Sequence, residues 1–272
     1  MKINKSIWFL CICFSFFSCV KKKGLIAPTE TECSNFSSLG NLVNWPGIDT
    51  VYNTPSFNPN NPNEIIYVRG IISTNKPYLV KRNLITNSET IIIADVWGKP
   101  DWSIKDWIVF NHADNQVWKI KSNGDSLTLL TPTLEGGHNA IWSPDGNKIA
   151  FIKEVGSTKY SIIADGLGNH LDTLTYFEFY LNDWSANGLF ICAPHNATVK
   201  YQNVQTNQVF DAADISVDQQ STNLAYINGL SWTPDSQYLI WSNKHGIYKT
   251  NIISKETIKI KTGSDSKRYT SI

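Results

Sequence analysis

The sequence predicts an all-β protein, a β-propeller built from four-stranded antiparallel blades. One short motif, an aromatic residue followed by a polar turn and then an apolar stretch, occurs five times. The copies are 40 to 48 positions apart, close to the roughly 40–45 residues that one blade needs. Beyond the first 18 residues, no stretch has the apolar spacing of an α-helix. The five aromatic residues are Phe57, Trp102, Trp142, Trp184 and Trp232.

Two copies of the motif are especially clear, Ile-Trp-Ser-Pro-Asp-Gly at residues 141–146 and Ser-Trp-Thr-Pro-Asp-Ser at residues 231–236. The aspartates, Asp145 and Asp235, are expected to accept hydrogen bonds from backbone amides of the turn, and the proline presets its first corner. We expect the aromatic residue on an innermost strand, wedged between two blades, where it would bury on the order of 150–250 Å². Because both aspartates recur at one repeat position, we interpret them as turn residues rather than catalytic groups.

The rest of each repeat supplies three more strands. In the second repeat, apolar and polar residues alternate over 107–110, 116–120 and 126–130, with Asn, Asp and Gly between the last two segments. Alternation over four to six residues, bounded by turn residues, is typical of half-buried antiparallel strands. Each repeat therefore predicts one complete blade.

The Trp-Ser-Pro-Asp-Gly turn and the strand after it resemble the WD40-like repeat of TolB-type propellers, which also occurs in the propeller domains of prolyl-oligopeptidase-like enzymes. The resemblance covers about residues 50–265. It implies a disc of blades around a central channel, used as a binding platform. Five repeats are visible, so we expect five or six blades. A sixth would combine residues 39–52 with residues 268–272 at the other end.

The N-terminus predicts export. Residues 1–18 have a basic start and an apolar run that is short for a membrane span. The run ends at Cys19, and this junction resembles the lipobox of bacterial lipoproteins, which implies cleavage before Cys19 and acylation of that residue. An ordinary secretory signal cleaved nearby and an uncleaved anchor are the alternatives. Val20, rather than Asp, follows the cysteine, and by the same resemblance this favours the outer membrane.

The predicted organisation is a signal peptide at residues 1–18, a flexible tether at 19–38 and the propeller at 39–272. The polar tether would hold the propeller clear of the bilayer, and the lysines at residues 21–23 would favour anionic headgroups. These lysines do not resemble the acidic run that some lineages use for surface export, so we expect a periplasm-facing, monomeric protein. Of the cysteines beyond the anchor, Cys33 and Cys192, the sequence does not decide whether they pair.

Charge and motifs narrow the function. The formal charge is +1 and becomes −1 when Lys2 and Lys5 leave with the signal, which argues against a nucleic-acid partner. The sequence shows no nucleophile elbow, zinc-protease helix, phosphate loop or dinucleotide fingerprint. We therefore predict no cofactor, no metal site and no catalytic residue.

The histidines suggest a binding face. If the predicted strands hold, His112, His195 and His245 fall in hairpins between second and third strands, and His138 falls between two repeats. These loops emerge at one end of a propeller, whereas His170 would lie at the other, and loops carry much of the function of a scaffold. The candidate face is Trp97, Lys99, His112, His138, His195 and His245.

The sequence favours a lipid-anchored, non-catalytic binding or scaffold module for an envelope protein or glycan. One alternative is a hydrolase or lyase that acts on envelope glycans or peptides with a site at the channel mouth. Another is the accessory propeller of a peptidase. Three or more converging ionisable side chains with displaced pKa values would support the enzyme.

Overall fold

The computed structural model describes Cys19–Val20 and residues 49–131, 136–174, 181, 183–195, 198–214, 227, 229–243 and 245–262. The predicted signal peptide, nearly all of the predicted tether, Cys33 and both halves of the postulated sixth blade, apart from residues 49–52, lie outside these residues. Cys19–Val20 form a short strand, β1, which pairs antiparallel with β2 so that Cys19 lies opposite Tyr52. Within the described residues, no helix has the length and apolarity to cross a membrane.

The described residues form five sheets, each with four consecutive antiparallel strands, and β1 adds to the first. The predicted all-β propeller is thus confirmed, with five blades. The strands are β2 (Thr50–Asn58), β3 (Asn61–Ile71), β4 (Lys76–Asn83) and β5 (Glu89–Ala94) in blade 1; β6 (Val96–Trp102), β7 (Trp107–His112), β8 (Val117–Lys121) and β9 (Thr128–Leu129) in blade 2; β10 (Gly136–Trp142), β11 (Lys148–Val155), β12 (Thr158–Asp165) and β13 (His170–Leu174) in blade 3; β14 (Asp183–Trp184), β15 (Phe190–His195), β16 (Thr198–Asn203) and β17 (Val209–Asp214) in blade 4; β18 (Gly229–Trp232), β19 (Tyr238–Asn243), β20 (Gly246–Asn251) and β21 (Thr257–Thr262) in blade 5.

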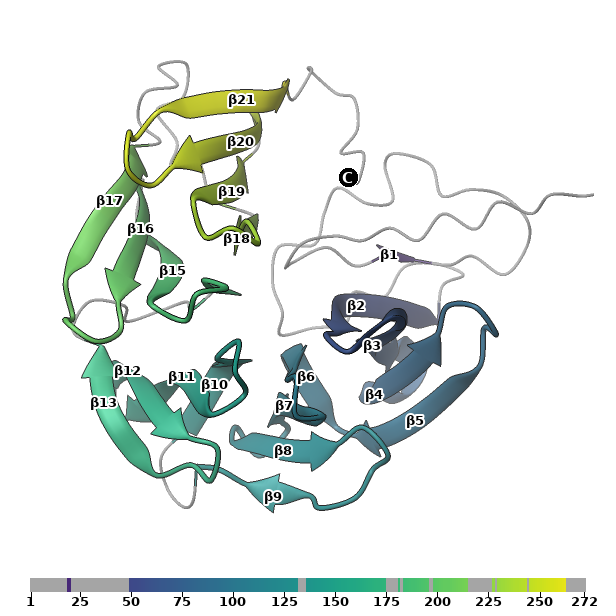
Figure 1. Ribbon diagram of the computed structural model, residues 1–272. Coiled ribbons are helices and arrows are strands. Elements are labelled where there is room, and N and C mark those ends of the chain that lie inside the picture. The colour runs from purple at the N-terminus through teal and green to yellow at the C-terminus, as the bar shows by residue number, and fades with distance from the viewer. Residues whose placement is uncertain are drawn as a thin grey trace, which may run out of the picture.

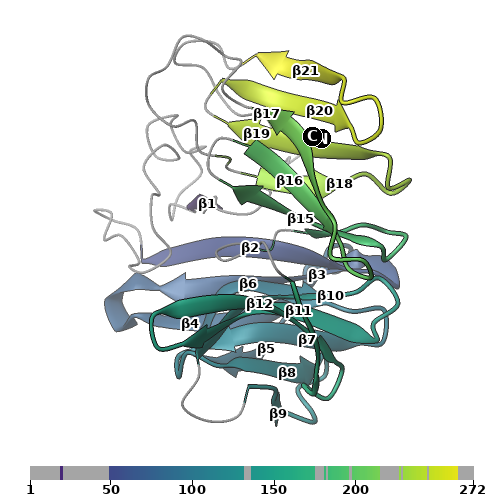
Figure 2. The same ribbon diagram turned by 90° about the vertical axis from the view of Figure 1, so that its left-hand side faces the viewer.

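The blades are arranged around a common axis, with the first strand of each blade innermost and the fourth strand outermost (Figure 1). Because consecutive strands are antiparallel, the turns after the first and third strands of every blade lie at one end of the propeller, which we call the front face. The other turns lie at the rear face. Figure 2 shows the front-face turns β18–β19 and β20–β21 together on its right-hand side.

Each tryptophan of the motif packs between its own blade and the preceding one. Trp102 belongs to an apolar cluster shared by blades 1 and 2, and Trp142, Trp184 and Trp232 do the same at the next three boundaries. These four side chains are 4 to 7% exposed, so the predicted wedge is confirmed for them. It is wrong for Phe57, which is 42% exposed, because no blade precedes blade 1 in the described part of the chain.

The motif turn has the predicted hydrogen bonds. Ser143 Oγ donates to Asp145 Oδ1 at 2.6 Å and accepts from the backbone N–H of Lys148 at 2.9 Å. Asp145 Oδ1 also accepts from the N–H of Asn147 at 3.0 Å, and Gly146 closes the turn at a φ of 64°, a conformation that glycine adopts at little cost. The aspartate is thus occupied in holding the turn.

Candidate site at the channel mouth

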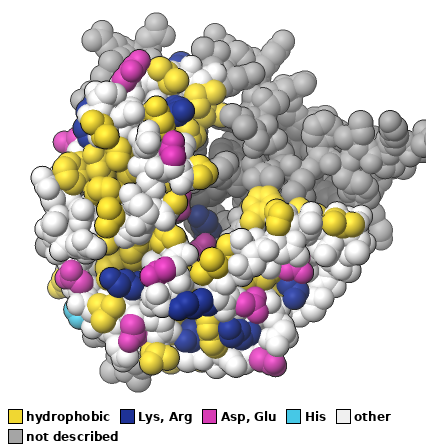
Figure 3. Space-filling model, viewed as in Figure 1, with side chains coloured by type: hydrophobic (Ala, Val, Ile, Leu, Met, Phe, Trp, Pro, Cys, Tyr) yellow, Lys and Arg dark blue, Asp and Glu magenta, His cyan; other side chains and the backbone are white. Residues whose placement is uncertain are grey.

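A cavity of about 280 Å³ opens at the front end of the central channel, lined by residues from all five blades. Figure 3 shows a hollow near the middle of the molecule with Lys or Arg and Asp or Glu side chains inside it. Its walls come from the ends of the innermost strands and from the motif turns. The repeat therefore builds the cavity by bringing one copy of the same turn from each blade to the axis.

The rim of the cavity is an apolar collar. The second residue after each motif aromatic is apolar and exposed in every blade, and all five line the cavity. A proline, isoleucine or alanine at this position has no hydrogen-bonding side chain to offer the turn. Apolar side chains that remain exposed around one opening are typical of a binding site. The collar consists of Pro59, Ile104, Pro144, Ala186 and Pro234.

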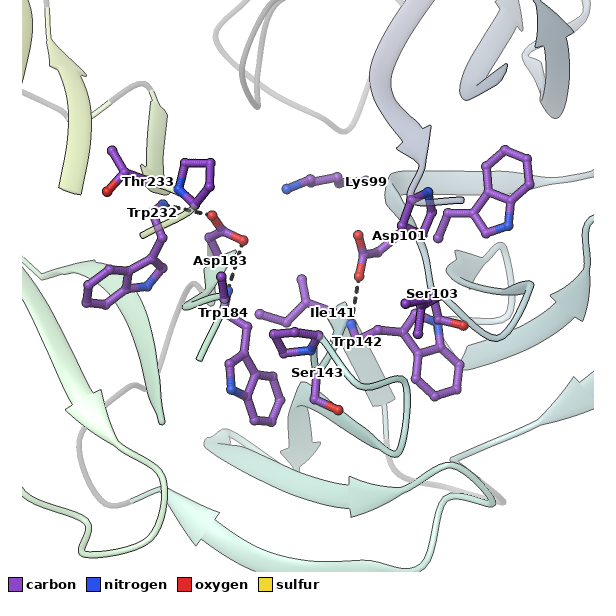
Figure 4. A pocket seen from close by; sticks show the side chains of 16 residues that line it. Lys99, Asp101, Ser103, Ile141, Trp142, Ser143, Asp183, Trp184, Trp232 and Thr233 are labelled. Atoms are coloured by element: carbon purple, nitrogen blue, oxygen red, sulfur yellow. Dashed lines mark hydrogen bonds between the residues drawn. The ribbon is translucent and has the colours of Figure 1, made fainter. Parts of the chain in front are cut away.

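The floor of the cavity carries three charged side chains. Lys99 and Asp101 project from β6, and Asp183 projects from β14 on the other side of the channel. In Figure 4 the Lys99 side chain extends between the two carboxylates. An apolar rim thus surrounds a floor with two carboxylates and one ammonium group.

Asp101 holds blade 3 as well as lining the cavity. Its Oδ2 accepts a 2.7 Å hydrogen bond from the backbone N–H of Trp142 at the end of β10. Burial raises the pKa of Asp101 above its ordinary value and the nearby Asp183 raises it further, whereas Lys99 and the Trp142 amide act in the opposite direction. Desolvation therefore outweighs the stabilisation that Lys99 gives to the carboxylate.

Asp183 makes the equivalent contact from blade 4 to blade 5. Its Oδ2 accepts from the backbone N–H of Trp232 at 2.8 Å and from Ser231 Oγ at 2.5 Å. Its Oδ1 accepts from the N–H of Trp184 at 2.9 Å. In blade 3 the equivalent position is Ile141, whose side chain cannot accept a hydrogen bond. The boundary between blades 3 and 4 is instead held by the apolar cluster that includes Ile141 and Trp184.

The floor brings three ionisable side chains together, and among them the pKa of Asp101 is raised. Both carboxylates accept hydrogen bonds from backbone N–H groups. Among the described residues, no three His, Cys, Asp or Glu side chains are grouped so as to hold a metal ion.

Several of the sequence-predicted site residues lie in strands, not in the loops where the sequence suggested them. Trp97 and Lys99 are both part of β6, where Trp97 pairs with Asn111. Gly98 lies between them at a φ of 71° within a register shift, and Lys99 reaches the cavity floor. Lys99 is therefore a channel residue and does not join the histidines.

The structure places four histidines at the rear end: His112 ends β7, His138 lies in β10, His195 ends β15 and His245 lies in the β19–β20 turn. His112 Nδ1 is 3.2 Å from Asp114 Oδ1. His138 Nδ1 is 3.7 Å from Glu154 Oε1; burial lowers the pKa of His138, against the effect of Glu154.

The fifth histidine, His170, begins β13 near the front end, and its ring nitrogen Nε2 lies 3.0 Å from Thr173 Oγ1.

Sequence reasoning missed Asp101, Asp183 and the collar as members of one site. The collar had a readable signal, an apolar residue two positions after each motif aromatic. Three of these positions are prolines, which a turn alone already explains, so nothing in the sequence suggests a second role for them. Nothing in the chain order indicates that Asp101 and Asp183 share a channel floor.

No family model and no curated protein matches the sequence. Among solved structures, TolB from Acinetobacter baumannii has a TM-score of 0.59 at 17% identity, and the match covers 76% of this chain and 53% of that one. An oligogalacturonate lyase in complex with manganese has a TM-score of 0.58 at 14% identity, over 76% of this chain and 67% of that one. A chain of a nidogen–laminin complex has a TM-score of 0.61 at 11% identity, over 90% of both chains.

Identities this low establish the fold alone, and the match spans only about half of the TolB chain. The expected resemblance to TolB-type propellers nevertheless agrees with these structures. The chain is a β-propeller with a TolB-like fold, with five blades in its described residues.

Proposed function

We propose that this protein is a non-catalytic binding module of the bacterial cell envelope that docks a partner protein over the mouth of its channel. The observation that carries the proposal is the apolar collar, to which each blade contributes one exposed residue. Exposed charged residues, among them Lys105, Asp145 and Asp235, directly follow the collar residues in the motif turns. Exposed apolar side chains bordered by polar ones are usual in a protein interface.

Further apolar side chains support the same face. Ile85, Leu167 and Ile253 occupy equivalent positions in the third turn of blades 1, 3 and 5, and they are 70%, 72% and 83% exposed. In each turn an Asn or Asp side chain caps the backbone N–H of the apolar residue, which fixes the tip. A partner broad enough to cover the mouth would reach these tips.

We also propose the address suggested by the N-terminal sequence. Acylation of Cys19 would attach the protein to the outer membrane, facing the periplasm, as a monomer. Several acyl chains hold a protein on a bilayer far more firmly than one. The partner would then be another envelope component, either a protein, as we favour, or a glycan.

Photocrosslinking in cells tests the docking face. Benzoylphenylalanine at Ala186, in the collar, is expected to give a discrete crosslinked product. The same group at Val155, an exposed residue at the rear end of β11, is the control. Crosslinking from Val155 but not from Ala186 would contradict the proposal and favour the rear face with His112 and His138.

A second candidate is an envelope hydrolase or lyase, favoured by the meeting of Lys99, Asp101 and Asp183 in one cavity. New reducing or unsaturated ends should then form when the protein is incubated with envelope glycans, and Asp183→Asn should abolish them. If no product forms and the Ala186 crosslink is present, the enzyme is excluded and the binding module is retained.

A further inference from the structure

We propose that the channel mouth takes a cationic group on an apolar stem, such as an arginine side chain of a partner or a free alkylguanidine. This inference rests on the proposed docking over the collar, and it adds the chemistry of the group that enters. The shape, the acceptors and the charge of the cavity each contribute to it.

The apolar collar favours an apolar stem. A group that enters from the front face passes the collar residues, which include Pro144, Ala186 and Pro234 from three successive blades. These side chains offer van der Waals contact and no hydrogen bonds. A chain of methylene groups satisfies such a passage, whereas a polar stem would lose its hydration there without replacement.

The floor supplies acceptors in excess. An ionised carboxylate has about four lone-pair sites. Asp101 accepts from the Trp142 and Trp102 amides, and Asp183 accepts from Trp232, Ser231 and Trp184. These five hydrogen bonds leave part of the capacity of the two carboxylates for Lys99 and an entering group. A guanidinium presents five N–H donors in a planar fork and can bind a carboxylate through two parallel N–H···O hydrogen bonds.

The charge of the floor has the matching sign. Two carboxylates, Asp101 and Asp183, share the cavity with one ammonium, Lys99. The raised pKa of Asp101, caused first by desolvation and then by Asp183, indicates that the carboxylate is under-compensated despite Lys99. A second cation would reduce this cost, so a basic group gains more from the floor than a neutral or acidic one.

Two capped peptides that differ only in the charge of one side-chain head group test the proposal. One carries arginine at the centre of Gly-Pro-Arg-Pro-Gly, and the other carries citrulline, which has the same stem and a neutral head. Binding to the full-length protein in detergent is measured by calorimetry and by the fluorescence of the tryptophans around the mouth. The arginine peptide is expected to bind about tenfold more tightly or better.

Variants locate the effect. Asp183→Asn should remove most of the preference for arginine, whereas Asp211→Asn, an exposed carboxylate on the outermost strand of the same blade, should retain it. Butylguanidinium alone tests the free ligand: binding as tight as the peptide would support the cationic site and assign it to a small molecule.

Equal binding of both peptides, or no binding of either, would overturn the cationic proposal. The Ala186 crosslink in cells does not depend on the charge of the entering group. A crosslink without arginine preference would therefore reject this inference while the docking face survives.

Discussion

Asp101 Oδ2 accepts a hydrogen bond of 2.7 Å from the backbone N–H of Trp142 across the boundary between blades 2 and 3. One carboxylate thus serves two purposes, since it holds an innermost strand and forms the channel floor. Asp183 repeats the contact with Trp232. The same residues therefore connect the stability of the propeller to the charge of its mouth, and their substitution should affect both.

Replacing Asp101 by asparagine should raise stability at neutral pH. The folded-state pKa of Asp101 lies above its unfolded value, so the folded state binds the extra proton. Protonated Asp101 therefore stabilises the folded state most below its unfolded pKa of about 3.9, and this stabilisation is lost as pH rises through the folded pKa. Asparagine keeps an oxygen for the Trp142 amide and carries no charge.

Urea unfolding of Asp101→Asn and of the original chain between pH 3 and 7 checks this prediction. The stability difference should be smallest at acidic pH and should grow toward neutrality. A difference that does not change with pH would show that desolvation does not control this carboxylate.

Trp142→Ala should destabilise the protein by about 3–5 kcal/mol, since a buried indole between two blades is lost. Phe57→Ala, at the same repeat position but 42% exposed, should cost less than about 1 kcal/mol. Thermal and urea unfolding measure both variants. Similar losses for the two would contradict the packing distinction between these positions.

Gly188→Asp should be more stable than Gly188→Ala by about 1 kcal/mol. In blade 2, Asp106 adopts a φ of 60° and accepts a 3.1 Å hydrogen bond from Trp102 Nε1. At the equivalent place in blade 4, Gly188 has a φ of 72° and open space around its Cα, while Trp184 Nε1 is buried without a hydrogen-bond partner.

Aspartate tolerates a positive φ better than alanine, so the same two substitutions in a Trp184→Phe background, which lacks the indole N–H, isolate the new hydrogen bond. Urea unfolding at pH 7 measures it. Equal stability of the two variants would mean that the aspartate does not reach the indole.

Cys19→Ser should abolish metabolic labelling by fatty acids and release the protein from membranes, because the acyl chains provide the attachment. Cys33→Ser is the matched control and should remain labelled and membrane-bound. Membrane fractionation reads both. Unchanged retention of Cys19→Ser would refute the lipobox interpretation.

The Cys192 thiol should be inert in the folded protein. It is fully buried and free, and burial raises the pKa of this thiol well above its ordinary value, which suppresses the reactive thiolate. In a Cys33→Ser background, mass spectrometry should find Cys192 unmodified by a maleimide under native conditions and modified after denaturation. Rapid native modification would contradict this burial.

The repeat made the fold readable in advance. Trp142, Pro144 and Asp145 each act through neighbours within a few positions or through the adjacent blade, so their spacing predicts turns, strands and blade length directly. Phe57 shows the limit of that reasoning, because a wedge requires a preceding blade, and the motif alone does not show whether one is present.

The sequence by itself determined the all-β class, the blade repeat and the structural role of the motif aspartates. Only the tertiary structure decided that Lys99, Asp101 and Asp183 meet on one channel floor and that Pro59 and Pro234 belong to one collar. The physical reason is that local patterns fix hydrogen bonds within a blade, whereas the circular arrangement brings together residues that are more than 80 positions apart.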